Sequence, residues 1–262
     1  MQLKSAKLAQ RFEQMAKIDS TNKSIYKYPM NFIKTCNFVL IFLFTFSLQA
    51  ETLAYQRAKS AKKISNPPNL NTQIIDNFEE HKVGKLPRSW RTWPFQRSKA
   101  SKVYKVRQEN KNRYLSAYDS EDISVQLLYN LNWDVNEFPI LAFRWRAQDL
   151  PAGAKESDDN KNDSACGVYV TLGQLSGHAL KYVWSSTLPV GKVVSRKNGK
   201  LKIKVLASGK SQAKKWKHFK VNVKKDYEQL FNKPLKRNPR LGILTDGNAV
   251  HKTASCDYDD FK

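Results

Sequence analysis

The feature that most constrains the fold is a succession of short apolar or alternating runs, broken by turn residues, from residue 72 to the C-terminus. In residues 201–206, apolar residues alternate with lysines, so one face of the strand would be buried and the other exposed to solvent. This run follows Asn198-Gly199, the strongest short-range hairpin signal. Strands are expected at residues 74–75, 102–107, 114–118, 123–131, 140–146, 168–172, 180–185, 190–195, 201–206, 216–223, 241–245 and 253–261. Many short strands with evenly spaced turns predict an all-β sandwich or barrel.

One segment has a different character. Residues 225–232 are short of β-branched side chains and stop before Pro234. This pattern predicts one short helix.

An uncharged apolar run at residues 38–50 follows Lys34 and ends at Ala50. This is the layout of a secretory signal peptide, and the run is shorter than the roughly 20 residues of a membrane span. Met30 would be its natural start, and an uncleaved signal anchor is the alternative because Leu48 is larger than the usual residue there. The signal predicts a periplasmic or secreted protein that meets the membrane only transiently.

Three regions follow from this reading. Residues 1–50 form an N-terminal extension and signal peptide, residues 51–70 a basic, disordered linker containing Pro67 and Pro68, and residues 71–262 one β-sandwich domain.

The net charge is +23. Residues 1–50 hold seven basic and two acidic side chains, which leaves +18 for the rest. Such a charge attracts polyanions, although it also serves solubility. Without a helix-turn-helix, zinc-finger or RNP-type motif, nucleic acid is not expected as a partner. The expected partner is an anionic envelope glycan or another polysaccharide.

Two cysteines, Cys166 and Cys256, lie beyond the signal. They permit one disulfide in an oxidising compartment, or they are two buried thiols. No zinc spacing and no G-x-S-x-G motif is present, so no cofactor and no catalytic residue is expected from motifs.

The one metal hypothesis is a structural calcium ion. Residues 158–162 begin like a calcium loop, but the sixth position is Asp163 instead of glycine, which rejects an EF-hand. Acidic groups at both ends of the domain, Glu79 with Asp257 and Asp259, could instead share a calcium ion if the first and last strands are neighbours. Surface charge is the alternative.

A ligand pocket is expected beside the long polar loop of residues 149–165. Asp158, Asp159, Arg144 and Trp184 would contribute to it. Because successive strand side chains alternate faces, one of the two acids should turn inward and pair with Arg144 or Arg146. The alternatives are a structural salt bridge or a solvated loop.

Aromatic faces are the other candidates, since sugar rings stack on them. Trp90 and Trp93, beside Pro87 and Pro94, are expected to be partly exposed, and Trp145 to be in the core. Trp90 is therefore also a candidate ligand-binding residue. Further aromatic side chains that are available are Phe95, Trp133, Trp184 and Trp216.

Together these fragments resemble the DUF3047 family of exported bacterial proteins, over about residues 74–261. The fragments that carry the resemblance are Phe78-Glu79, Gly84-x-Leu86-Pro87-x-x-Trp90, residues 139–146, Asp158-Asp159, Tyr182-Val183-Trp184, Asp226-Tyr227-x-x-x-Phe231 and Leu244-Thr245-Asp246. The chain departs from the family's D-x-D-N-T turn, because Asn248 replaces the second acid and Val250 the threonine.

The resemblance implies a jelly-roll-type β-sandwich like those of carbohydrate-binding modules. We therefore expect a non-catalytic glycan-binding or envelope-associated module. One alternative is a polysaccharide-active enzyme whose carboxylate pair is hidden in the sequence. Another is an interaction protein held to the anionic envelope by charge alone.

Overall fold

The computed structural model describes residues 72–172, 177–235 and 239–262. The expected signal peptide and linker lie outside these residues. The described residues belong to one compact unit, residues 71–262.

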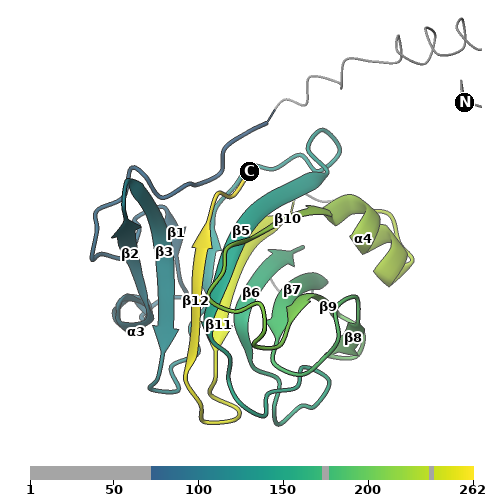
Figure 1. Cartoon of the computed structure of the whole chain (residues 1–262). Helices are drawn as coiled ribbons and strands as arrows, with labels where there is room; N and C mark the ends of the chain where they lie inside the picture. The colour runs from purple at the N-terminus through teal and green to yellow at the C-terminus, as the bar shows by residue number, and fades with distance from the viewer. Residues whose placement is uncertain (1–71, 173–176, 236–238) are drawn as a thin grey trace, which may run out of the picture. The chain divides into compact units, whose positions relative to one another are not determined.

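Two β-sheets form this unit (Figure 1). The seven-stranded sheet has the order β1 (Trp90–Arg91), β4 (Leu127–Tyr129), β11 (Arg240–Asp246), β6 (Ser164–Thr171), β7 (Ala179–Ser185), β9 (Leu201–Ser208) and β8 (Val193–Arg196). The five-stranded sheet has the order β10 (Lys217–Asn222), β5 (Ile140–Asp149), β12 (Ala254–Asp259), β3 (Asn112–Asp119) and β2 (Tyr104–Glu109). The paired strands are antiparallel except β7 and β9, which are parallel. The predicted all-β sandwich is confirmed, and it is consistent with a jelly roll.

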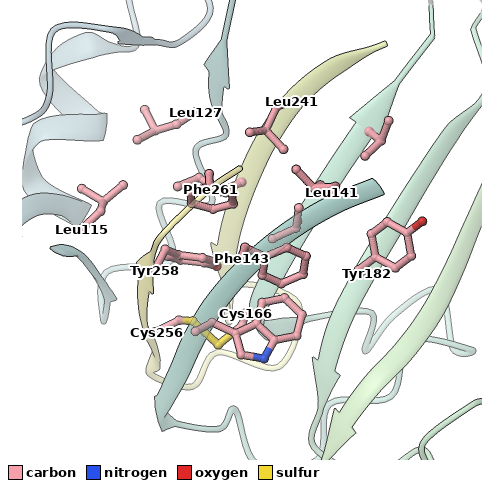
Figure 2. Close-up of a cluster of buried hydrophobic side chains, with 14 of the residues drawn as sticks. Leu115, Leu127, Leu141, Phe143, Cys166, Tyr182, Leu241, Cys256, Tyr258 and Phe261 are labelled. Atoms are coloured by element: carbon pink, nitrogen blue, oxygen red, sulfur yellow. A yellow bond between two sulfur atoms is a disulfide. The ribbon is translucent and has the colours of Figure 1, made fainter. Parts of the chain in front are cut away.

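The alternation read from the sequence defines the inner faces of the sheets. Leu141, Phe143, Trp145 and Ala147 on β5 are buried, and the residues between them are not fully buried. Figure 2 shows part of the core to which both sheets contribute, with Phe143 from β5 and Leu241 from β11. The predicted core position of Trp145 is confirmed, since the side chain is completely buried.

A disulfide joins the two sheets through this core. Cys166 on β6 and Cys256 on β12 are bonded, with their Cα atoms 5.4 Å apart (Figure 2). The sequence allowed either a disulfide or two buried thiols, and the structure contains the disulfide.

Two helices are present among the described residues, one more than expected. Helix α4 (Val223–Phe231) confirms the predicted helix, and the Asn222 side chain caps it by accepting from the Lys225 N–H at 2.8 Å. Helix α3 (Arg97–Val103) was not expected, and the strand predicted at residues 102–107 begins two residues later. It buries only Ala100 and Val103, which is too sparse an apolar pattern to be read as a helix.

The strand predicted at residues 123–131 is also shorter than expected. Only β4 is extended there. The carboxylate of Asp119 accepts the backbone N–H groups of Glu121, Ile123 and Ser124, which bends the chain before the strand begins.

Within the described ranges, no helix combines the length and the apolar character that crossing a bilayer requires.

Candidate ligand-binding face of the five-stranded sheet

A ladder of paired charges covers the outer face of the five-stranded sheet. Arg144 and Arg146 alternate with the core residues of β5, and the register places them opposite Asp259 and Asp257 of β12. Arg144 Nη2 donates to Asp259 Oδ2 at 2.5 Å, and Arg146 Nε donates to Asp257 Oδ2 at 2.9 Å. Both carboxylates are almost completely buried, at 1% and 3% exposure.

Amide side chains complete the hydrogen bonding of this ladder. Gln148 donates to Asp257 at 2.6 Å, and Asn112 donates to Asp259 at 2.9 Å. Burial raises the pKa of Asp259, while Asn112 and Arg144 act in the opposite direction. The ladder is therefore a fully partnered network and not a pair of free carboxylates.

Aromatic rings lie over the ladder. The indole of Trp216 is centred 4.8 Å from the Arg144 guanidinium carbon and 4.7 Å from that of Arg146. Trp216 reaches this position because it directly precedes β10, whose Lys217 pairs with Trp145. The Tyr114 ring meets Trp216 edge-on at 5.6 Å.

Trp216 and Tyr114 are both half-buried. Burial, followed by the charge of Asp257, raises the pKa of Tyr114, so its hydroxyl stays protonated. The result is an aromatic surface on a rigid base of two guanidiniums, with amide and phenol groups beside it. Such a surface can stack on an apolar ring face and hydrogen-bond to hydroxyl groups.

A second charged cluster lies under the loop between β5 and β6. Glu156 is completely buried and accepts from Ser164 Oγ at 3.0 Å and from Ser185 Oγ at 2.6 Å. Lys181 is 2% exposed, and its Nζ lies 3.9 Å from Asp246 Oδ1. These groups hold the loop against the seven-stranded sheet.

Burial sets the protonation of this cluster. It raises the pKa of Asp246 to about 6, although the nearby Lys181 ammonium lowers it. Burial alone would lower the pKa of Lys181, but Asp246 and Tyr169 outweigh it and keep the ammonium charged. Asp163 is also buried, and its Oδ1 atom has no hydrogen-bond partner, so burial raises its pKa as well.

The expected pairing of Asp158 or Asp159 with Arg144 or Arg146 is wrong. Asp159 pairs with Arg196 of β8, whose guanidinium also donates to the carbonyl oxygen of Asp158. The loop packs against the seven-stranded sheet, whereas both expected arginines belong to the other sheet. The buried acids of this loop are Glu156 and Asp163, which the sequence reasoning missed.

A polar hollow does lie beside the loop. Its lining contains neither Arg144 nor Trp184, and consists of Lys155, Ser157, Asp158, Asp159 and residues 195–199. It offers no aromatic face.

Two predicted aromatic candidates are completely buried. Trp184 donates to the carbonyl oxygen of Gly209 at 3.1 Å, and Trp90 donates to Asp76 at 2.9 Å. The expected partial exposure of Trp90 is therefore wrong, because its indole packs between Phe78 and Phe261 in the core. Trp93 is 55% exposed, as expected.

Asp76 also contacts a histidine and a serine, but not in the geometry of a hydrolase triad. His81 Nε2 lies 2.9 Å from Asp76 and 3.3 Å from Ser89 Oγ, so one ring nitrogen faces both groups. A triad needs the two different nitrogens of the ring. The trio anchors the start of the domain.

The carboxylates proposed for calcium have other partners. Glu79 accepts the backbone N–H of Arg113 at 2.8 Å, and Asp257 and Asp259 are held by arginines. A cation would have to displace those guanidiniums. Across the described ranges, no three His, Cys, Asp or Glu side chains are grouped as metal ligands.

A family model described as "Protein of unknown function (DUF3047)" matches residues 88–262. No curated protein matches the chain. Among solved structures, the xyloglucanase domain of NopAA, a type three effector from Sinorhizobium fredii in complex with cellobiose, is 9% identical with a TM-score of 0.35, covering 57% of this chain and 81% of that one. Wild-type ENZbleach xylanase is 12% identical with a TM-score of 0.33, covering 75% and 89%. With TM-scores below 0.5, neither likeness establishes a shared fold or activity.

Proposed function

Since the chain belongs to the DUF3047 family, described as proteins of unknown function, we propose its function from the outer face of its five-stranded sheet. The domain is a non-catalytic glycan-binding module, and its ligand stacks on Trp216. The observation that carries this proposal is the half-exposed indole held over Arg144 and Arg146.

The chemistry of this face suits a sugar ring. The C–H face of a pyranose is apolar and stacks on an aromatic ring, while its hydroxyl groups need donors and acceptors at the edge. Arg146 and Tyr114 contact the indole and supply polar groups next to it. Because the base is preorganised by charge-assisted hydrogen bonds, little side-chain order has to be created on binding.

The ligand class is a polysaccharide, including anionic glycans of a bacterial envelope. The net charge of the chain favours an anionic polymer. A periplasmic or secreted location, which the apolar run at residues 38–50 predicts, is part of the proposal. The disulfide is compatible with an oxidising compartment.

At this face, the hydrogen bonding of the two buried carboxylates favours binding over glycoside hydrolysis. A hydrolase needs one carboxyl group that donates a proton and one that attacks or activates water. Asp257 and Asp259 instead accept hydrogen bonds from arginines, which occupy their oxygens.

A glycan array probed with the full chain tests the proposal. We expect selective binding that persists at raised salt and that Trp216→Ala lowers at least tenfold. The matched control is Trp93→Ala, which removes a tryptophan from another surface and should leave glycan binding unchanged.

Three results would overturn the proposal. Trp216→Ala could bind as the wild type does, with melting curves showing that both are folded. Binding could vanish at raised salt, which would indicate attraction by charge alone. Release of reducing sugar from a bound glycan would indicate the enzyme instead.

A further inference from the structure

The segment of residues 81–108 is strongly basic. It contains nine lysines and arginines and no acidic residue. It runs through β1, α3 and β2, which lie together at one side of the sandwich in Figure 1. Eight of the nine cationic side chains are exposed. Lys102 forms an ion pair with the exposed Glu121 at 2.9 Å.

A tight turn between β1 and α3 presents two aromatic side chains from this basic surface. The Gln96 N–H donates to the Trp93 carbonyl oxygen at 3.1 Å, which places Pro94 and Phe95 at the two central positions. We call residues 93–95 the aromatic tip. Phe95 is 101% exposed and Trp93 is 55% exposed.

Phe95 adopts a backbone conformation that suits glycine or asparagine better. Its φ is 65°, and a bulky side chain in that region has a cost of roughly 1–3 kcal/mol. Burial of the ring does not offset this cost, because the ring is fully exposed to solvent. A strained residue with an exposed apolar ring is therefore explained by something that the ring contacts outside this chain.

We propose that the aromatic tip docks the domain onto an anionic phospholipid bilayer. Trp93 sits at the level of the headgroups, where indole rings are favoured, and the Phe95 ring enters the edge of the acyl region. Arg88, Arg91 and Arg97 flank the tip in the sequence and bind lipid phosphates, each cation near the surface contributing roughly 1 kcal/mol.

A bilayer fits better than a nucleic acid or a protein pocket. Base stacking needs aromatic faces along a groove, and a ring that is 101% exposed has no groove wall beside it. A protein pocket would need only the two rings, whereas the cations here extend over β1, α3 and β2. A broad surface of negative charge satisfies both features.

The aromatic tip is distinct from the glycan face. Trp216 lies over Arg144 and Arg146 of β5, whereas residues 93–95 connect β1 of the seven-stranded sheet to α3. The basic segment borders the glycan face only at Arg107 of β2, which lies opposite Tyr114. The two functions can therefore be tested independently.

Quenching of tryptophan fluorescence by brominated lipid is a direct test with the full chain. All six tryptophans lie between residues 90 and 216, so the apolar run at residues 38–50 has no indole of its own. Trp93 is the one among them with a largely exposed side chain. We expect quenching by vesicles of brominated phosphatidylcholine and phosphatidylglycerol, and little by brominated phosphatidylcholine alone.

The variants separate docking from folding. Trp93→Phe should abolish most of the quenching. Phe95→Gly should weaken it at least fivefold while raising the melting temperature, because glycine relieves the strain at this φ. The control Val190→Ser removes an apolar side chain that is 64% exposed elsewhere, and Trp216→Ala removes the glycan platform. Both should keep the quenching of Trp93.

The proposal is overturned if Trp93→Phe is quenched like the wild type, or if Phe95→Gly docks unchanged. Equal quenching by neutral and anionic vesicles would remove the role of the cations. Binding of single-stranded oligonucleotides that depends on both rings, without quenching by lipid, would identify a nucleic acid as the partner.

Discussion

At the scale of residues, the stability of the domain depends on the arginines that pair with the buried carboxylates of the outer ladder. Arg146→Gln leaves Asp257 buried without its cation, and the loss of one partner of a buried pair costs about 3 kcal/mol. Urea unfolding should measure this loss. The matched control Lys102→Gln breaks a pair whose side chains are 59% and 61% exposed, and should cost less than about 1 kcal/mol. Equal costs in the two variants would contradict the structural role of the ladder.

The raised pKa of Asp246 predicts a pH dependence of stability. Its pKa is about 6 in the folded state, against an ordinary value of 3.8. The folded state therefore holds the proton more tightly than the unfolded state, so this group's contribution to stability falls as the pH rises through that window. It is constant above about pH 6. Lys181 faces the same group and stays charged throughout.

Urea unfolding between pH 4 and pH 7 checks this sign, with Asp246→Asn as the reference. Relative to that variant, the wild type should lose stability as the pH rises. Parallel curves would mean that Asp246 titrates at its ordinary pKa.

At the scale of elements, the turn from β11 to β12 depends on Gly247. A Cβ atom there would collide with the carbonyl oxygen of Lys252, which is main chain and cannot rotate away. Gly247→Ala should destabilise the domain by about 2 kcal/mol or more, measured by thermal and urea unfolding. The turn also supplies the Val250 N–H to Asp163, so the loop cluster should loosen with it.

Gly191→Ala is the matched control for that turn. Gly191 has a φ of 84° and no atom near the position of a Cβ, so alanine adds backbone strain alone, roughly 1–2 kcal/mol. If both variants lose the same stability, the close approach at Gly247 has no separate effect.

At the scale of the whole molecule, the Cys166–Cys256 bond connects the two sheets across 90 residues of sequence. Replacing both cysteines with alanine should lower the free energy of unfolding by about 2–5 kcal/mol, mainly because the unfolded chain loses a constraint. Denaturant unfolding with and without a reductant measures it. The double variant is its own control, since a reductant should destabilise the wild type and leave the variant unchanged.

Strand positions and inward faces follow from local alternation, which depends on neighbouring residues along one chain. For this reason, the runs around residues 141–147 and 201–206, the hairpin at Asn198-Gly199 and helix α4 were all predictable. Helix α3 was not, because its apolar face contains only two residues.

Contacts between distant segments were decided only by the tertiary structure. Arg144 meets Asp259 at a separation of 115 residues, and Trp216 reaches the ladder because β10 pairs with β5. Chain order pointed instead to Asp158 and Asp159, which belong to a loop on the other sheet. Sheet order and register arise from the packing of the whole core, so local patterns show which side chains point outward but not which of them meet.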